Sequence, residues 1–216
     1  MKYKKITRAI FINRPNRFIA NVLVDGKFVT VHVKNTGRCK ELLYKNVPVI
    51  LEKSDNPSRK TKYDLIMVYK DKIGWVNIDS QVTNKVVYEW LKKQDYDFIK
   101  PEYKYGNSRI DFYMEKGEDR FLMEVKGCTL EVDGIGYFPD APTERGVKHL
   151  KELAKASKEN IKCFVAFVIQ MNGIDIVKPN IIMHKEFAIA WDEAVNAGVK
   201  ILFFKCFVDE YGITIQ

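Results

Sequence analysis

One stretch of sequence is central to the fold of the second half of this chain. It is Phe121-Leu122-Met123-Glu124-Val125-Lys126-Gly127. The apolar residues in this stretch predict a buried strand. Glu124 and Lys126 stand two residues apart, so their side chains project from the same face of that strand, together with Leu122. A carboxylate and an ammonium group on one strand face indicate a charge pair.

A second apolar strand precedes the first one and carries one acidic residue. It is Ser108-Arg109-Ile110-Asp111-Phe112-Tyr113-Met114, and the polar hairpin Glu115–Arg120 connects the two strands. If they pair, Asp111 and Glu124 converge, and two close carboxylates repel each other unless a cation lies between them. Mg²⁺ or Mn²⁺ suits such oxygen ligands and keeps bound waters. One such water beside Lys126 is a candidate nucleophile against a phosphodiester.

The alternative is a hairpin whose solvent-exposed face carries Glu124 and Lys126 by chance. The flanking residues favour the metal site, because Asp111 lies between Ile110 and Phe112 and Glu124 lies within an apolar run. The candidate catalytic residues are therefore Asp111, Glu124 and Lys126.

The surrounding sequence predicts a mixed α/β (α+β) core. We expect helices over 84–94, 143–157 and 186–197, with Asn84 capping the first and Pro142-Thr143 starting the second. Further strands are expected over 96–104, 161–169 and 199–207. The second helix follows the Glu124 strand, so Arg145, Lys148 and His149 are candidates to hold phosphate beside the metal. The alternative is a solvated polar face.

The first 80 residues predict a small β-barrel. Strands are expected over 6–13, 17–24, 27–34, 47–52, 63–69 and 73–78, with Asp25-Gly26 as a hairpin turn. Asn35-Thr36-Gly37 is predicted as a turn before a short helix, Arg38–Tyr44. Three strands, a short helix and further strands are the order of an OB-fold, a module that often binds oligonucleotides.

The charge of the chain is divided unequally between these two parts. The 216 residues have a net charge of +8, but residues 1–80 contain 17 Lys/Arg and 7 Asp/Glu, whereas residues 81–216 contain 19 and 21. A basic module favours nucleic acid as its partner, against the alternative of a solvated basic surface. The candidate nucleic-acid-binding residues of this module are Arg14, Arg17, Lys34, Asn35, Arg38, Arg59, Lys60 and Lys62.

Other classes of protein fit the sequence poorly. The longest apolar run, Cys163–Ile169, is much shorter than the ~20 residues of a membrane helix, and the N-terminus lacks the features of a signal peptide. The four cysteines form no CxxC pair, which argues against a zinc knuckle and favours a reduced, cytoplasmic protein.

Four motifs in register resemble the sugar fermentation stimulation protein A family. They are His32-Val33-Lys34-Asn35-Thr36-Gly37-Arg38-Cys39-Lys40-Glu41-Leu42-Leu43, Ser108–Phe112, Glu124–Leu130 and Phe138-Pro139-Asp140-Ala141-Pro142-Thr143-Glu144-Arg145-Gly146-Val147-Lys148-His149-Leu150. The resemblance implies an N-terminal OB-like domain, assigned to 1–80, and a PD-(D/E)xK nuclease-like domain, assigned to 81–216. It also implies non-specific DNA binding and a regulatory link to sugar (maltose) metabolism.

The resemblance further implies roles for the residues of the site. Asp111 and Glu124 become metal ligands with the Val125 carbonyl, and Lys126 positions or polarises water. Either Glu89 or Glu102 supplies a further carboxylate, and the sequence does not choose between them.

Two functions remain open at this point. One is a Mg²⁺-dependent nuclease, and the other is a non-catalytic DNA-binding regulator that retains the nuclease scaffold. An RNA-binding module is a weaker third option. The fold resemblance leaves a homodimer open as well.

Overall fold

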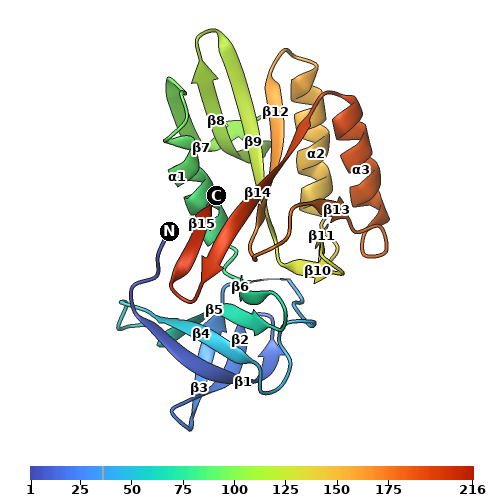
Figure 1. The fold of residues 1–216 in the computed structure, drawn as a ribbon. Coiled ribbons are helices and arrows are strands. Elements are labelled where there is room, and N and C mark those ends of the chain that lie inside the picture. Colours follow the sequence, from blue (N-terminus) through green and yellow to red (C-terminus); the bar gives the residue numbers. More distant parts are fainter. Residues whose placement is uncertain (36) are drawn as a thin grey trace.

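The computed structural model describes residues 1–35 and 37–216. Its first part is a closed β-barrel, at the bottom of Figure 1. The strands are β1 (Ile6–Asn16), β2 (Ile19–Val24), β3 (Lys27–Val33), β4 (Pro48–Lys53), β5 (Tyr63–Lys70) and β6 (Gly74–Asn77). They follow the order β3-β2-β1-β4-β5-β6, and a parallel pairing of β3 with β5 closes the barrel. This is the predicted OB-fold topology.

Local sequence explains the first hairpin of the barrel. Asp25 and Gly26 connect β2 to β3 and have φ values of 49° and 76°. Positive φ at both central residues is what a type I′ turn requires, and Asp-Gly supplies it. Side chains along each strand point alternately into and out of the barrel, so Val22, Val31 and Val33 are buried between more exposed neighbours.

The short helix predicted over Arg38–Tyr44 is wrong. The described residues of this segment form turns, in which the backbone N–H groups of Leu42 and Leu43 both donate to the Cys39 carbonyl. Cys39 has a φ of 46°, in the left-handed region, and this conformation interrupts any helix at that point. The turn predicted at Asn35-Thr36-Gly37 includes Thr36, which lies outside the described residues.

The second part is a twisted mixed sheet with helices on both faces. The sheet has the order β15-β14-β12-β9-β8-β7. Its strands are β7 (Phe98–Tyr105), β8 (Ser108–Lys116), β9 (Asp119–Cys128), β12 (Lys162–Ile169), β14 (Lys200–Asp209) and β15 (Gly212–Ile215). The central strands β9, β12 and β14 are parallel, which explains the near-continuous apolar sequence of β12.

The helices of this part cover opposite faces of the sheet (Figure 1). They are α1 (Val82–Leu91), α2 (Glu144–Ser157) and α3 (Lys185–Asn196). Helix α1 packs Val86 and Val87 into one core with Met123, whereas α2 packs Leu150 into the other core with Leu122. The strand β9 is therefore buried on both sides, and its alternate residues face different helices.

Several elements differ from the sequence expectations. A small sheet of β10 (Leu130–Val132), β11 (Ile135–Phe138) and β13 (Val177–Pro179) was not predicted, nor was β15. Helix α1 begins at Val82 with Gln81 as its N-cap residue, so Asn84 does not cap it. Thr143 does cap α2, because its hydroxyl accepts the Gly146 N–H at 3.1 Å.

Buried polar contacts join the two parts. Gln170, after β12, donates from Nε2 to the Asn77 and Asp79 carbonyls at the end of the barrel. Asn77 in turn donates to the Tyr3 hydroxyl at 3.0 Å. Lys2 forms a β-bridge with Gly212, so the N-terminus lies against the second part. Among the described residues, no helix is long and apolar enough to cross a membrane.

Candidate metal site and nucleic-acid cleft

The candidate metal site lies where β8 and β9 separate. Their ladder ends at the pair Phe112–Met123, and the next positions in register are Asp111 and Glu124. Beyond this point the Asp111 side chain, and not the backbone of β8, is the hydrogen-bond acceptor for β9: Asp111 Oδ2 accepts the Val125 N–H at 2.7 Å. The structure thus brings the two predicted carboxylates to opposing positions at an opening in the sheet.

Glu124 is held through one of its two oxygens. Oε1 accepts hydrogen bonds from Lys126 Nζ at 2.5 Å and from His149 Nδ1. Oε2 is buried and accepts no hydrogen bond from the described residues. Burial raises the pKa of Glu124, but Lys126 and His149 outweigh it and hold the pKa below its ordinary value. Glu124 is therefore ionised at neutral pH with one free acceptor oxygen.

Asp111 is held from two sides and is stabilised less well as an anion. Asn84 on α1 donates from Nδ2 to Oδ1 at 2.7 Å, and Val125 donates to Oδ2. Burial, followed by the charge of Glu124, raises the pKa of Asp111, against the opposing effects of Val125 and Lys126. The negative charge of Glu124 therefore disfavours ionisation of Asp111.

The residues present fit a hard divalent cation. The buried Oε2 of Glu124 lacks a partner among the described residues, and an unpartnered buried carboxylate oxygen is costly unless a cation or donor satisfies it. Val125 directs its N–H toward Asp111, and N–H and C=O groups of one strand residue point to the same side, so its carbonyl faces that side too. Two carboxylates and a carbonyl suit Mg²⁺, which retains waters. In the described part of the chain, no three His, Cys, Asp or Glu side chains cluster around one point.

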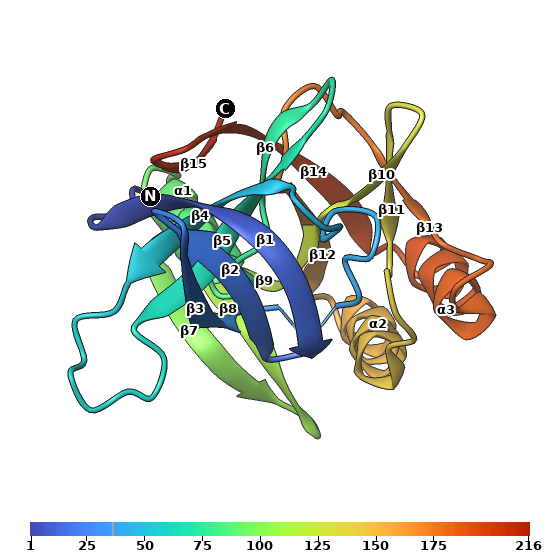
Figure 2. The ribbon, with the colours of Figure 1, turned by 90° about the horizontal axis from the view of Figure 1, so that it is seen from below.

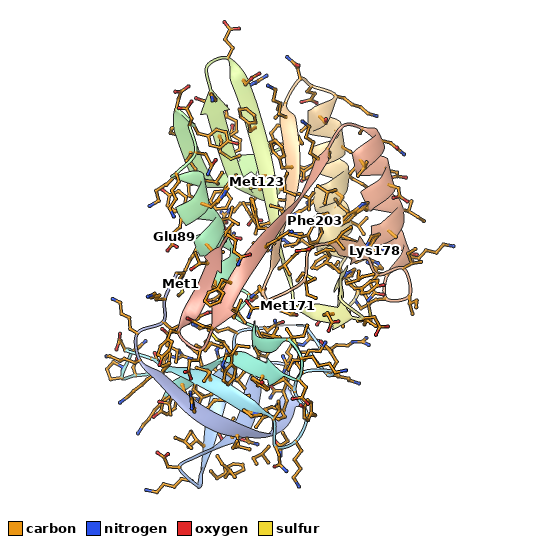
Figure 3. All side chains as sticks on the ribbon, viewed as in Figure 1. Met1, Glu89, Met123, Met171, Lys178 and Phe203 are labelled. Atoms are coloured by element: carbon orange, nitrogen blue, oxygen red, sulfur yellow. The ribbon has the colours of Figure 1, made fainter. Side chains whose placement is uncertain are left out.

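The structure places neither Glu89 nor Glu102 with these ligands. Glu89 is on the outer side of α1 and pairs with the amino group of Met1 at 3.0 Å (Figure 3). Glu102 is exposed on β7 and lies 3.7 Å from Arg109. Asn84 occupies the position beside Asp111 instead. This role of Asn84 was not predicted, because the sequence pattern assigned the residue to the helix cap.

The three predicted phosphate ligands on α2 have different surroundings in the structure. His149 is buried, with Nδ1 on Glu124 and Nε2 accepting from Arg145 Nε at 3.4 Å. Lys148 is exposed, and its Nζ donates to the Asn107 carbonyl at 2.9 Å. Of the three, His149 thus supports the carboxylate, whereas Arg145 and Lys148 remain at the surface.

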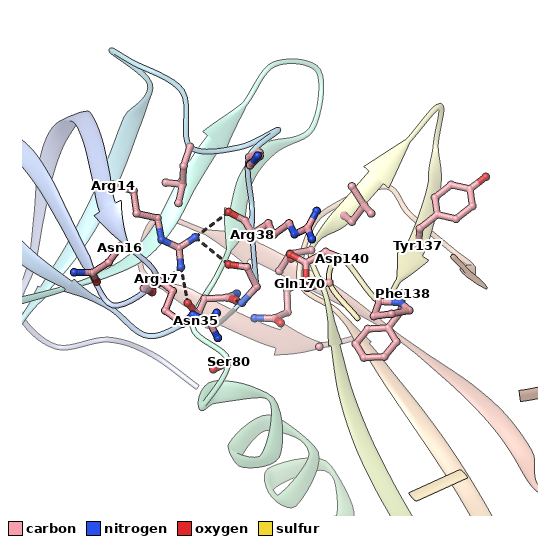
Figure 4. Close-up of a pocket in the computed structure, with 18 of the residues that line it drawn as sticks. Arg14, Asn16, Arg17, Asn35, Arg38, Ser80, Tyr137, Phe138, Asp140 and Gln170 are labelled. Atoms are coloured by element: carbon pink, nitrogen blue, oxygen red, sulfur yellow. Dashed lines mark hydrogen bonds between the residues drawn. The ribbon is translucent and has the colours of Figure 1, made fainter. Parts of the chain in front are cut away.

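Four predicted nucleic-acid-binding residues meet in a cleft between the barrel and the sheet domain (Figure 4). Arg14, Arg17, Asn35 and Arg38 line this cavity of about 1010 Å³ from the barrel side. The Arg14 guanidinium donates to the carbonyls of four loop residues, namely Arg17, Asn35, Gly37 and Arg38. Arg14 therefore shapes the barrel wall of the cleft.

The remaining predicted residues lie elsewhere on the barrel. Lys34 and Arg59 both contact Asp64, at 3.2 Å and 2.6 Å. Burial raises the pKa of Asp64, yet Arg59 and Lys34 bring it down to about 2. Lys34 and Arg59 thus form ion pairs within the barrel. Lys60 and Lys62 lie on the loop between β4 and β5.

The fold and site together define a two-domain protein, an OB barrel followed by a restriction-endonuclease-like domain. Family models agree with this architecture: the SfsA N-terminal OB domain matches residues 12–78, and the sugar fermentation stimulation protein RE domain matches residues 81–212. The chain belongs to the sugar fermentation stimulation protein family.

Relatives with similar sequences cover the whole chain. The sugar fermentation stimulation protein homologue of Clostridium beijerinckii is 53% identical over 100% of this chain and 97% of its own length. The homologue of Ruminiclostridium cellulolyticum is 50% identical with the same coverage. The structure of Pyrococcus furiosus SfsA in complex with Ca²⁺ has a TM-score of 0.88 at 24% identity, over 100% of this chain and 95% of that one.

Proposed function

We propose that this protein is a divalent-metal-dependent nuclease that binds DNA without sequence specificity. The observation that carries the proposal is the buried Oε2 of Glu124, which lies without a hydrogen-bond partner among the described residues, in a site shared with Asp111 and Lys126. The Ca²⁺ complex of the Pyrococcus furiosus relative supports a divalent cation in this fold. Mg²⁺ or Mn²⁺ is the proposed cofactor.

The residues of the site have different proposed roles. Asp111, Glu124 and the Val125 carbonyl would hold the cation, which supplies Lewis-acid activation of a water and of the phosphate. Lys126 presents an ammonium group beside Glu124 with a side chain 15% exposed, so it remains open to a water or a phosphate oxygen. There it would orient the nucleophile and balance negative charge that develops in the transition state.

The supporting residues keep these ligands in place. Asn84 fixes the Asp111 carboxylate through Oδ1, and His149 fixes Glu124 through Oε1. Since hydrogen bonds of this kind orient metal ligands, both side chains preorganise the site for the cation.

Cleavage of labelled DNA with Mg²⁺ or Mn²⁺ tests the proposal. We expect Glu124→Gln and Asp111→Asn to lower cleavage at least about a hundredfold, because each removes a ligand charge. Glu89→Gln is the matched control, since it makes the same charge change on an exposed residue of the same domain. No cleavage by the wild type, or cleavage that survives both site variants, would contradict the proposal.

A second candidate function is a non-catalytic DNA-binding regulator of sugar metabolism. One observation favours it: Glu89 and Glu102 lie away from the site and pair with Met1 and Arg109. Among the described residues, the site therefore has two carboxylates and no third one. DNA binding without cleavage in either metal would select this function.

A further inference from the structure

The cleft between the domains carries a cluster of free positive charges. Arg17, Arg38, Lys40 and Lys45 line it, and all four are exposed. Within residues 1–35 and 37–216, none of these four forms a salt bridge, in contrast to Lys34 and Arg59. The surface around the cleft therefore attracts a polyanion.

The carboxylate in the cleft is already engaged. Asp140 Oδ2 accepts the Cys39 N–H at 3.3 Å, which links the sheet domain to the barrel loop. Gly37 is needed at this contact, because a Cβ there would lie 2.5 Å from the same oxygen. Asp140 thus positions the basic loop, and the charge that the cleft presents to a ligand is positive.

A polar group forms part of the cleft wall on the side of the sheet domain. Gln170 has an exposed fraction of 1%, and its Nε2 is fixed by three acceptors, at 2.9 Å from the Asn77 carbonyl and 3.1 Å from both Asn77 Oδ1 and the Asp79 carbonyl. Its Oε1 accepts no hydrogen bond from the described residues. Gly127 permits this arrangement, because a Cβ at Gly127 would lie 2.2 Å from Oε1. Gln170 and Gly127 therefore form a fixed polar part of the cleft wall.

The cleft leads toward the candidate metal site along β9. Gly127 lines the cleft, and Glu124 lies three residues earlier on the same strand, which is about 10 Å at the rise of a β-strand. A chain of phosphates that rests on the basic residues could therefore extend to the carboxylates within a few nucleotides.

The dimensions of the cleft favour one strand over two. Its volume of about 1010 Å³ is typical of the largest small-molecule sites, which accommodate a few nucleotides. Duplex DNA keeps its bases inside and is usually read by an element that enters a groove about 12 Å wide. A cleft with walls from two domains instead accepts a strand whose bases and phosphates are both accessible.

We propose that the interdomain cleft binds a short single-stranded segment of DNA. Its phosphates contact Arg17, Arg38, Lys40 and Lys45, and its bases lie along the wall that includes Gly127 and Gln170. The binding itself is independent of the nuclease proposal, whereas the delivery of this strand to Asp111 and Glu124 rests on that proposal.

Fluorescence anisotropy with a labelled single-stranded DNA oligonucleotide, in EDTA, tests the binding without any cleavage. The test variant is R38Q/K40Q in the cleft, and the matched control is K27Q/K53Q. The control makes the same change of charge on two exposed residues of the barrel, on β3 and β4, that do not line the cleft. The strand β3 lies on the side of the barrel away from β10 and β11 (Figure 2).

We expect R38Q/K40Q to weaken binding at least about tenfold and to reduce the salt slope by about 1.4, the value for two phosphate contacts on a single strand. K27Q/K53Q should stay within about twofold of the wild type. An unlabelled duplex of the same sequence should compete poorly.

Three results would overturn the proposal. They are equal competition by the duplex, equal loss of affinity in the two variants, and stronger competition by an RNA strand of the same sequence. Because EDTA removes the metal, a failed nuclease assay leaves this result unaffected, so the two proposals can fail separately.

Discussion

Asp111→Asn should stabilise the fold while it removes the proposed activity. The pKa of Asp111 is raised because burial and the charge of Glu124 disfavour its ionised form. Where the folded protein carries this charge, the unfavourable surroundings of the charge weaken folding. An uncharged side chain of the same shape removes that cost.

The hydrogen bonds of the site can survive this substitution. The oxygen of the introduced amide can accept the Val125 N–H, as Asp111 Oδ2 does at 2.7 Å. The new amide NH₂ then faces Asn84, which can rotate its own amide to present an oxygen. With both contacts kept, we expect a gain of about 1 kcal/mol, or a rise in Tm of about 2–4 °C for a chain of this length.

The pH dependence follows from the direction of the pKa shift. Since the folded pKa of Asp111 is above its ordinary value of 3.8, the cost grows as pH rises through the folded pKa. Below about pH 4 Asp111 is protonated in both the folded and the unfolded state, so the variant and the wild type should become equally stable. Glu124→Gln should show the opposite sign at neutral pH, because the pKa of Glu124 is lowered.

Urea unfolding at neutral and acid pH, with EDTA throughout, measures both effects. A loss of more than about 1 kcal/mol in Asp111→Asn at neutral pH would refute the reasoning. A gain that persists unchanged below about pH 4 would refute it equally. Mg²⁺ added in place of EDTA should stabilise the wild type by about 2.7 kcal/mol at a hundredfold excess over its Kd, and the variant much less.

Three further predictions concern contacts around the site and in the barrel. His149→Ala should lower the affinity for Mn²⁺ about tenfold in calorimetry, because it removes the hydrogen bond that orients Glu124. His149→Gln should recover part of this affinity, since its amide can still donate to Glu124, and equal affinities of the two variants would count against an orienting role of His149. Arg14→Lys should cost about 1–3 kcal/mol in urea unfolding, because an ammonium group has three donors for four carbonyls, and an unchanged midpoint would contradict this. Asp64→Asn should cost about 2 kcal/mol at neutral pH and almost nothing near pH 2, since the pKa of about 2 makes the Arg59 ion pair stabilising above pH 4 and lost in acid; a pH-independent cost would argue against it.

Local sequence was sufficient to predict several parts of the fold and site. The Asp25-Gly26 turn, the helix start at Pro142-Thr143 and the shared face of Glu124 and Lys126 each depend on residues within a few positions of one another. Turn chemistry, helix-start signals and strand alternation are local properties, and the structure confirms these three predictions.

The contacts that required tertiary packing were not predictable. His149 was expected to hold phosphate, with a solvated polar face as the alternative, but the packing of α2 on the sheet buries it against Glu124. Asn84 reaches Asp111 because α1 begins at Val82 and packs against β9, next to the end of the pairing between β8 and β9. Helix ends are the least certain feature of a sequence pattern, and this shift of two residues concealed the contact.

The ion pairs of the barrel show the same limitation. Lys34 was expected to contact nucleic acid, because a basic residue at a strand end is usually exposed. Closure of the barrel pairs β3 with β5 at His32 and Asp64, and this places Lys34 against a buried carboxylate. The sequence pattern carried no sign of that long-range pairing.

The central claim is that Asp111 and Glu124 hold a divalent cation, and a crystal soaked in Mn²⁺ tests it most directly. We expect an anomalous peak between the two carboxylates, in contact with Glu124 Oε2 and the Val125 carbonyl. The absence of a peak there, with Glu124 still bound only to Lys126 and His149, would contradict the claim.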